Sequence, residues 1–217
     1  MKLAIYGAGG LGREIYELSR QIGRWEDIYF IDDTVVSDKD YYINGVKTLH
    51  YTSAANLFPK DGIEFVIALG EPEYRKKLYE KVKSDGFNFT TLIHPGVYIS
   101  SSTKLGEGVI IQTNAVLTCN IEIGCNTLIQ NTATVGHDTK IGMHCVVSAN
   151  DVVAGHCNIG DCVYIGLNVP VRENISIGSD SIIGMGSVVL KDIPGNVIAM
   201  GNPARAMKNK DDRRVFN

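Results

Sequence analysis

From residue 93 onward, the hydrophobic residues repeat with a period of six. An aliphatic side chain occupies position 93 and every sixth position after it up to 189, seventeen times without exception. This period fits neither the 3.6-residue turn of a helix nor an ordinary strand pattern, but it is typical of parallel strands wound into a coil of hexapeptides. The position four residues after each aliphatic is mostly small or aliphatic, with Asp151 the one charged exception. We therefore expect each hexad to form one flat side of a prism.

Residues 1–92 follow a different pattern, in which short apolar runs alternate with helical periodicity. The predicted strands cover residues 2–6, 28–31 and 65–69, and the predicted helices residues 13–22 and 73–84. Strands that alternate with helices favour a small parallel α/β sheet. The prediction is thus an α/β nucleotide-binding-like domain over residues 1–92, then the coil with its closing segment over 93–207, and a charged tail over 208–217.

A glycine-rich turn joins the first predicted strand to the first predicted helix. Its sequence, GAGGLG over residues 7–12, has the GxGxxG spacing of nucleotide-binding folds, and Asp32 and Asp33 follow about twenty residues later. In such folds backbone N–H groups approach a phosphate at the start of the helix, and an acid accepts a ribose hydroxyl. Only about one of the two halves of a dinucleotide fold is visible, so one nucleotide is predicted rather than NAD. Alternatively, the glycines only permit a tight turn between strand and helix.

Composition narrows the function further. The chain has 217 residues, a net charge of −3 and no basic cluster, which argues against a nucleic-acid partner. No apolar run approaches the roughly 20 residues that span a bilayer, and no secretory signal is recognisable. The five cysteines form no CxxC pair, and Cys145 and Cys157 fall in the small inward positions of the coil. We expect a cytoplasmic protein with no nucleic-acid or membrane partner.

The order of these features resembles a known family. The segments IYGAGGLG, FIDD and IALGEPEYRKKLYEKV, then the coil and GNPARAMK, are similar to those of the bacterial sialic-acid O-acetyltransferases and UDP-amino-sugar N-acetyltransferases, the NeuD/PglD-like group. Residues 93–194 resemble the left-handed parallel β-helix of hexapeptide acyltransferases, in which three hexads make one triangular coil. The resemblance implies an acetyl-CoA-dependent acetyltransferase that acts on an amine or a hydroxyl of a nucleotide-activated sugar, by general-base-assisted direct transfer. It also implies that the small Rossmann-like domain binds the nucleotide through Gly7, Gly9, Gly10, Gly12, Asp32 and Asp33.

The catalytic candidates are a histidine and an acid at one outward corner of the coil. His137 and Asp138 follow Val135 at positions where neither is needed for the core. Within the pattern TVxH[DE]xxIG, His137 resembles the family's general base and Asp138 the carboxylate that orients it. If one coil is eighteen residues, Gly155 lies directly above His137, where its backbone N–H is a candidate oxyanion donor, as in the family. By the same arithmetic His156 lies above Asp138, and either shares this carboxylate or merely caps the stack.

The C-terminal part of the coil resembles the closing segment of acetyl-CoA-dependent hexapeptide enzymes. The resemblance implies that acetyl-CoA is the acyl donor, that no metal takes part, and that CoA contacts Gly155, Leu167, Met185, Gly201, Pro203 and Arg205. It also implies a homotrimer with CoA between adjacent prisms. An apolar wall on such a protein usually meets another copy. The outward side chains expected to do so are Val116, Leu128, Val146 and Ile182.

Three positions depart from the family's pattern. Leu11 replaces the histidine of the usual GxxGHG turn, Gln130 replaces an asparagine seven residues before the base, and Val146 replaces a second histidine nine residues after it. The first histidine is an expected contact of the acceptor, and the second an expected contact of the acetyl group. The sequence therefore leaves open the sugar, its nucleotide, the choice between N- and O-acetylation and the length of the acyl group.

Two other functions are compatible with such a chain. A zinc lyase of the γ-carbonic-anhydrase kind uses the same prism, with three histidine ligands shared between subunits. That alternative needs a close histidine pair, whereas His137, His144 and His156 are expected to project from different corners or coils, with His144 on the surface or at a trimer interface. The third alternative is an inactive nucleotide-binding scaffold, against which the presence of His137, Asp138 and Gly155 argues.

Overall fold

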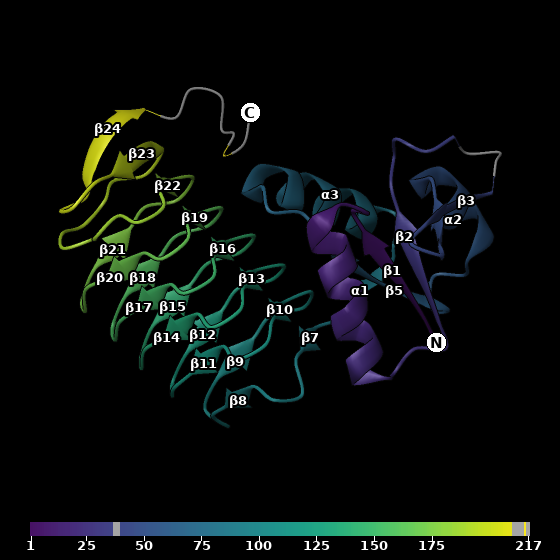
Figure 1. Cartoon of the computed structure of the whole chain (residues 1–217), viewed down its shortest axis with the longest axis horizontal. Coiled ribbons are helices and arrows are strands. Elements are labelled where there is room, and N and C mark those ends of the chain that lie inside the picture. Colours follow the sequence, from purple (N-terminus) through teal and green to yellow (C-terminus); the bar gives the residue numbers. More distant parts are fainter. Residues whose placement is uncertain (37–39, 210–214, 216–217) are drawn as a thin grey trace.

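Two folded parts lie side by side in the computed structural model of the chain (Figure 1). The structure describes residues 1–36, 40–209 and 215. An α/β domain is followed by a left-handed parallel β-helix, as predicted. Helices α1 (Gly10–Ile22) and α3 (Pro72–Ser84) of the first part both contact the coil, although they cover opposite faces of its sheet. None of the described helices is long and apolar enough to cross a membrane.

The N-terminal domain is a six-stranded, mainly parallel sheet of order β3-β4-β2-β1-β5-β6. Successive residues of its central strand point to opposite faces, and residues 3–6 are all buried because α1 covers one face while α2 and α3 cover the other. The short hairpin β3–β4, the helix α2 and the strand β6 are not predicted from the sequence. The remaining elements are β1 (Lys2–Tyr6), β2 (Asp27–Ile31), β3 (Tyr41–Ile43), β4 (Val46–Leu49), α2 (Tyr51–Leu57), β5 (Ile63–Ile67) and β6 (Asn88–Phe89).

The glycine-rich turn is tightly packed at some positions and open at others. A Cβ on Gly12 would lie 2.0 Å from the carbonyl oxygen of Gly7, whereas a Cβ on Gly10 would have no atom within 4 Å. We therefore expect Gly12→Ala to lower the free energy of unfolding by about 2 to 4 kcal/mol, and the matched change Gly10→Ala to alter it by less than about 1 kcal/mol. Urea denaturation of both variants tests this expectation. Equal stabilities would contradict the close approach of the backbone at Gly12.

Residues 92–193 wind into a prism with three walls, each a sheet of short parallel strands. Successive strands of a wall pair one coil apart, as Val116 does with Thr134. The first wall contains β7 (Leu92–Ile93), β10 (Ile110–Ile111), β13 (Leu128–Ile129), β16 (Val146–Val147), β19 (Tyr164–Ile165), β22 (Ile182–Ile183), β23 (Val197–Met200) and β24 (Arg205–Asn209). The second wall contains β8 (Tyr98–Ile99), β11 (Val116–Leu117), β14 (Thr134–Val135), β17 (Val152–Val153) and β20 (Pro170–Val171). The third wall contains β9 (Lys104–Leu105), β12 (Glu122–Ile123), β15 (Lys140–Ile141), β18 (Asn158–Ile159) and β21 (Ser176–Ile177).

The interior of the prism is filled by the aliphatic residue of each hexad and the residue four positions later. Cys145 and Cys157 are buried there, as predicted. Asp151 is buried as well, and its carboxyl group accepts hydrogen bonds from the backbone N–H groups of Ser148 and Val169 at 2.7 and 2.8 Å. Burial raises the pKa of Asp151 to about 8. The one charged exception in the inward pattern is therefore largely protonated at neutral pH.

The first wall is covered from β7 to β16 by the chain's own N-terminal domain. Leu128 and Val146 belong to the same buried cluster as Ile15 and Leu18 of α1, and Ile182 is also buried. The prediction that Leu128 and Val146 meet another copy is therefore wrong, because α1 and its neighbours occupy that surface. The pattern of the coil alone could not distinguish a wall that faces a second domain from one that faces a second chain.

The other two walls differ in polarity. The second wall presents apolar side chains to the solvent, and Tyr98, Val116 and Val152 are 71%, 43% and 46% exposed. The third wall is polar, and Lys140 pairs with Glu122 there at 3.6 Å. The second wall is therefore the exposed apolar face of the coil.

The corner between the third and first walls contacts α3. His144 is buried at this corner, where its ring packs edge-to-face on Tyr79 with centroids 5.2 Å apart. Its Nδ1 lies 3.0 Å from Nδ2 of Asn126. Burial and the neighbouring Arg75 lower the pKa of His144 to about 4, so the ring is neutral and its Nδ1 accepts from the amide. The prediction of a surface or trimer-interface position for His144 is wrong because α3 covers this corner.

The strands β23 and β24 form an antiparallel pair that closes the end of the first wall. β24 runs to Asn209, two residues past the predicted end of the coil domain at 207. Residues 210–214 and 216–217 of the predicted charged tail lie outside the described residues. Val215 is described, and its backbone N–H donates to both carboxylate oxygens of Glu71 at 2.8 Å. The chain thus returns to the N-terminal domain at this residue.

Candidate active site

His137 and Asp138 lie at the corner between the second and third walls, where β14 ends and β15 begins. Asp138 has a φ of 58°, and so does His156 one coil above it. The backbone N–H of His156 donates to the carbonyl oxygen of His137 at 2.8 Å, which confirms the predicted stacking. A Cβ on Gly136 would lie 2.5 Å from the backbone nitrogen of Gly155, so the coil above requires a glycine before the histidine. Both catalytic candidates therefore project outward from a rigid corner.

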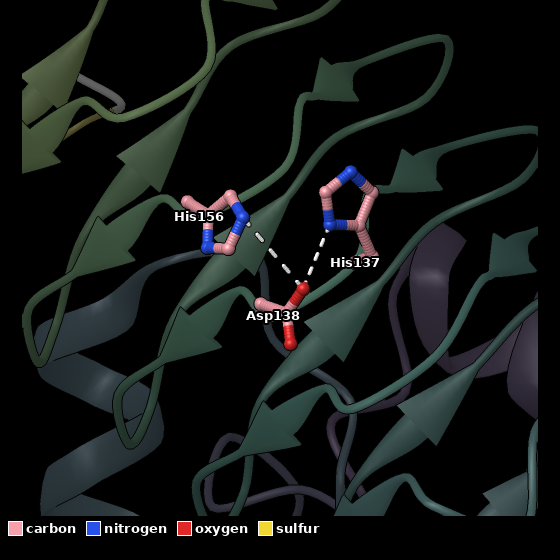
Figure 2. Close-up of side chains that lie close together, drawn as sticks. All are labelled: His137, Asp138 and His156. Carbon is pink, nitrogen blue, oxygen red and sulfur yellow. Dashed lines mark hydrogen bonds and ion pairs between the residues drawn. The ribbon is translucent and has the colours of Figure 1, made fainter.

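Asp138 is surrounded by polar side chains, two of which are imidazoles (Figure 2). Its Oδ2 lies 2.8 Å from Nδ1 of His137 and 3.8 Å from Nε2 of His156. Its Oδ1 accepts a hydrogen bond from Nδ2 of Asn120 at 3.0 Å. The two imidazole rings are perpendicular, with centroids 5.0 Å apart. The carboxylate is thus hydrogen-bonded to His137, while His156 is close enough only for a charge interaction.

The carboxylate determines which nitrogen of His137 is available. Hydrogen bonds from His137 and then Asn120 lower the pKa of Asp138. An ionised carboxylate can only accept, so Nδ1 of His137 carries a proton. In the uncharged ring, Nε2 is then the nitrogen with a free lone pair. A carboxylate that fixes the tautomer in this way is the arrangement found around a histidine general base.

Gly155 lies against the free nitrogen of His137. A Cβ at this position would lie 2.7 Å from Nε2 and 2.8 Å from Cε1 of the ring, so only glycine leaves the imidazole where it is. The backbone N–H of Gly155 donates to no acceptor among the described residues. A hydrogen-bond donor and an oriented imidazole are therefore available at the same corner.

One group of side chains in the described part of the chain has the composition of a metal site. The possible ligand atoms of His137, Asp138 and His156 all lie within 4.8 Å of one another. His137 and His156 do project from different coils, as expected, but consecutive coils stack them, so the inference that the coil lacks a close histidine pair is wrong. His144 is buried beneath α3 and does not join them. Two histidines and an acid are ligands that zinc accepts, so a metal assay is a necessary test of the lyase alternative.

Most of the predicted CoA contacts lie at the opposite edge of the second wall. Leu167 and Met185 are at the corner between the first and second walls, one coil apart, and both are exposed. The chain beyond β23 continues at this corner with Gly201, Pro203 and Arg205. Only Gly155 shares a corner with His137. A single chain therefore does not bring His137 together with the other predicted CoA contacts.

The predicted nucleotide contacts gather at one edge of the N-terminal sheet. The glycine-rich turn follows β1, and Asp32 and Asp33 follow β2. Because β1 and β2 are parallel neighbours, both groups lie at the carboxyl ends of these strands. A Cβ on Gly9 or Gly10 would meet open space, whereas Gly7 and Gly12 are confined by packing. Gly9 offers no side-chain cap to the first turn of α1. The start of this helix therefore leaves room and N–H groups for an anion.

The acids of this edge already have partners. Asp33 accepts hydrogen bonds from Tyr6 Oη at 2.6 Å and Lys81 Nζ at 3.2 Å. Burial alone would raise the pKa of Asp33, but these hydrogen bonds outweigh it and the pKa is lowered. Oδ1 of Asp32 accepts from the backbone N–H and the hydroxyl of Thr34. Asp33 therefore links the end of β2 to α3, a contact that the sequence pattern does not indicate.

The three departures from the family pattern occupy different places. Leu11 is half-buried and packs against the cluster between α1 and the sheet. The Oε1 atom of Gln130 accepts from the backbone N–H of Ala149 at 3.2 Å, at the corner between the first and second walls. Val146 is buried under the N-terminal domain. None of the three side chains lies at the corner that carries His137.

Comparisons with known proteins support the same architecture. Residues 2–82 match the family described as PglD N-terminal domain. A curated relative, the UDP-N-acetylbacillosamine N-acetyltransferase of Bacillus subtilis (strain 168), is 34% identical over 113 residues, which cover 51% of this chain and 50% of that protein. The chain thus spans about half the length of the curated relatives that it matches.

Solved structures match nearly the whole chain. WeeI from Acinetobacter baumannii AYE is 31% identical with a TM-score of 0.86, over 95% of this chain and 100% of that one. The acetyltransferase domain of PglB from Neisseria gonorrhoeae FA1090, in complex with acetyl coenzyme A, is 29% identical with a TM-score of 0.89, over 95% of this chain and 98% of that one. Because the similarity extends over both the N-terminal domain and the coil, the chain belongs to the NeuD/PglD-like family of hexapeptide-repeat sugar acetyltransferases.

Proposed function

We propose that the protein is an acetyl-CoA-dependent acetyltransferase that acts on an amine or a hydroxyl of a nucleotide-activated sugar in the cytoplasm. The observation that carries the proposal is the pair His137 and Asp138, 2.8 Å apart at an open corner, with Gly155 against Nε2 of the histidine. The solved relative in complex with acetyl coenzyme A supports the acyl donor. The curated relative named for a UDP-sugar supports the class of acceptor.

In the proposed reaction, the acceptor nitrogen or oxygen attacks the thioester carbonyl of acetyl-CoA. Nε2 of His137 takes the proton that the nucleophile loses, and Asp138 stabilises the imidazolium that forms. The backbone N–H of Gly155 donates to the negatively charged oxygen of the tetrahedral intermediate. Collapse of the intermediate breaks the C–S bond, so the acetyl group stays on the sugar, and the proton on His137 passes to the departing sulfur of CoA.

An amine on a nucleotide-linked sugar is the first acceptor to test. The curated relative from Bacillus subtilis and a second one, the GDP-perosamine N-acetyltransferase of Escherichia coli O157:H7, are both named as N-acetyltransferases of nucleotide-linked sugars. In this chain, Gly9 and Gly10 leave open space at the uncapped start of α1, which suits the phosphates of a nucleotide. We propose that this turn, with Asp32 and Asp33 beside it, holds the nucleotide of the acceptor.

We propose further that the protein works as a homotrimer joined through its second wall. Most outward side chains of that wall are apolar, and Tyr98, Val116 and Val152 are well exposed in a single chain, whereas soluble proteins rarely leave such a surface uncovered. CoA would then lie between two prisms, with Leu167 and Met185 of one chain next to His137 of another. Such an arrangement would unite the two groups of residues that a single chain keeps apart.

The position of Gly155 allows a direct test of the proposed acyl-transfer corner, which is the corner between the second and third walls that carries His137 and Asp138. We expect Gly155→Ala to lower kcat/KM by at least about 100-fold, because the added Cβ would overlap Nε2 of His137 and displace the base. Steady-state rates with acetyl-CoA measure the effect, and an unchanged melting temperature shows that the coil is intact. Activity within threefold of the wild type would contradict the placement of the base.

Ligand-induced stabilisation identifies the acceptor. We expect one class among UDP-, dTDP-, CMP- and GDP-linked sugars to raise the melting temperature, since a ligand at 100 times its Kd stabilises the native state by roughly 2.7 kcal/mol. The free nucleotides serve as controls. Each sugar that stabilises the protein is then tested as an acceptor of the acetyl group. Stabilisation by none of them would count against a nucleotide-linked substrate.

A metal assay separates the acetyltransferase from the zinc lyase, and a binding assay separates it from an inactive scaffold. The lyase alternative rests on the close approach of His137, Asp138 and His156. Protein washed with a chelator should retain full acetyl transfer. Stoichiometric zinc that is lost together with activity would favour the lyase instead. Failure to bind acetyl-CoA would favour the scaffold.

A further inference from the structure

A guanidinium group is completely buried where the two parts of the chain meet. Arg75 of α3 has no exposed surface, and its five N–H groups make five hydrogen bonds. Nε and Nη2 donate to the backbone oxygen of Asn126 at 3.0 and 2.6 Å, and Nη2 also donates to its Oδ1 at 3.0 Å. Nη1 donates to the backbone oxygens of Ile67 and Leu69 at 2.7 and 2.9 Å. One side chain therefore binds the backbone at three positions in two domains.

These acceptors are carbonyl oxygens rather than carboxylates. Burial lowers the pKa of Arg75 to about 9, so the group is still protonated at neutral pH. Burying a charge without an opposite charge is costly, and a pair of apolar residues would join two surfaces without that cost. The planar fork of an arginine, however, fixes several acceptors in one geometry. This geometry is the property that an apolar contact could not supply.

On the side of the N-terminal domain, the acceptors support the glycine-rich turn. Ile67 ends β5, and Leu69 belongs to the segment that follows it. That segment packs directly on the turn, because a Cβ on Gly7 would lie 2.7 Å from the carbonyl oxygen of Ala68 and 3.0 Å from Cδ2 of Leu69. Arg75 thus fixes the segment against which the turn rests.

On the side of the coil, the acceptor is Asn126, which lies at a buried corner. Asn126 lies between the third and first walls with a φ of 56° and is fully buried. Its Nδ2 donates to the backbone oxygen of Arg75 at 3.0 Å and also contacts Nδ1 of His144. The corner and α3 are therefore hydrogen-bonded in both directions, which makes their relative position well defined.

We propose that Arg75 is a positioning residue for the acceptor, which sets the place and orientation of the glycine-rich turn relative to the coil. The proposal rests on the proposed function, in which a sugar held by its nucleotide at this turn must reach an acyl-transfer corner. Arg75 contacts neither ligand in this scheme and acts through Ile67, Leu69 and Asn126. A displacement of about 1 Å is enough to cost roughly 100-fold in rate when two reactants must meet.

The test compares variants that differ in whether they keep the charge and the planar guanidinium group of Arg75. Arg75→Lys keeps the charge but not the planar geometry, Arg75→Met removes both, and Lys77→Met is the matched control at an exposed position of the same helix. We expect Arg75→Lys to lower kcat/KM for the nucleotide-linked sugar at least tenfold, through a higher KM and a lower kcat, and Arg75→Met to lower it more. KM for acetyl-CoA should stay within twofold, and the control should match the wild type.

A second variant and a second measurement cover the case in which Arg75→Met does not fold. Asn126→Ala removes the side-chain acceptor but keeps the backbone oxygen, so it should lower the same kcat/KM by less than Arg75→Lys. Amide hydrogen exchange should become faster at residues 7–12 and 68–70 in Arg75→Lys and remain unchanged around His137. This measurement needs no substrate.

The possible outcomes distinguish the positioning role of Arg75 from the proposed function of the protein. A lower melting temperature with unchanged kcat/KM and unchanged exchange in the turn would show a purely structural role and overturn the positioning role. Faster exchange in the turn of a protein whose wild type acetylates no nucleotide-linked sugar would refute the proposed function, while the effect of Arg75 on the turn would stand.

Discussion

Replacement of His137 by alanine is expected to lower the rate of acetyl transfer by on the order of 10² to 10⁴, the usual contribution of a positioned general base. The ring is oriented by the hydrogen bond between its Nδ1 and Asp138, and alanine removes the side chain whose free nitrogen lies next to Gly155. Binding of acetyl-CoA, measured by calorimetry, should be retained because most of its predicted contacts lie at another corner.

Substitution of Asp138 gives a second, smaller expected loss of rate for comparison with His137→Ala. Asp138→Asn should cost less than His137→Ala, because Asp138 orients the base and does not itself transfer the proton. The matched variant His144→Ala changes a histidine of the same coil that lies buried beneath α3, away from this corner. It should affect stability more than the rate constant of the folded enzyme. A rate within threefold of the wild type for His137→Ala would remove His137 from the mechanism.

The second large effect concerns assembly. If CoA binds between two prisms, an isolated monomer should be inactive, and a mixture of two inactive variants should regain activity. His137→Ala removes the base, and Met185→Trp blocks the opposite edge of the second wall, where Met185 is 74% exposed. After subunit exchange, some mixed trimers hold an intact His137 next to an intact Met185. The activity of the mixture, compared with each variant alone, measures this complementation.

Two results would contradict a shared site. One is full activity of a species that sediments as a monomer at the assay concentration. The other is the absence of any regained activity when subunit exchange has been demonstrated separately. A charged substitution on the second wall, such as Val116→Glu, should dissociate the proposed trimer and abolish activity together, whereas Lys140→Glu on the polar third wall should do neither.

The fold of the coil could be predicted because its pattern is local and repetitive. The same two inward positions recur in every hexad, so the walls, the corners and the stacking of residues one coil apart follow from counting. That arithmetic places Gly155 above His137 and His156 above Asp138, and the structure has both. Asn120, one coil below Asp138, binds the second oxygen of this carboxylate. It is not among the predicted site residues, although the same count of eighteen would identify it.

The contacts between the two parts of the chain could not be predicted in the same way. His144 and Val146 look like surface residues of a coil, and they are buried only because α3 and α1 cover the adjoining corner and wall. Arg75 looks like one of several basic residues on an exposed helix, yet its partner is Asn126, 51 residues away in the sequence. No periodicity links positions at such a separation. The hairpin β3–β4 was missed because its strands are too short for alternation to be visible.

The most direct test of the central claim is acetyl transfer by the purified, chelator-washed protein. The protein is incubated with acetyl-CoA and a UDP-linked amino sugar. The release of the CoA thiol is followed with time, and the mass of the sugar product is measured by mass spectrometry. The account predicts that thiol release depends on the sugar, that each product molecule carries one added acetyl group, and that both signals nearly vanish with His137→Ala. It would be contradicted if no nucleotide-linked sugar, with an amine or a hydroxyl acceptor, were acetylated, or if His137→Ala acetylated it as fast as the wild type.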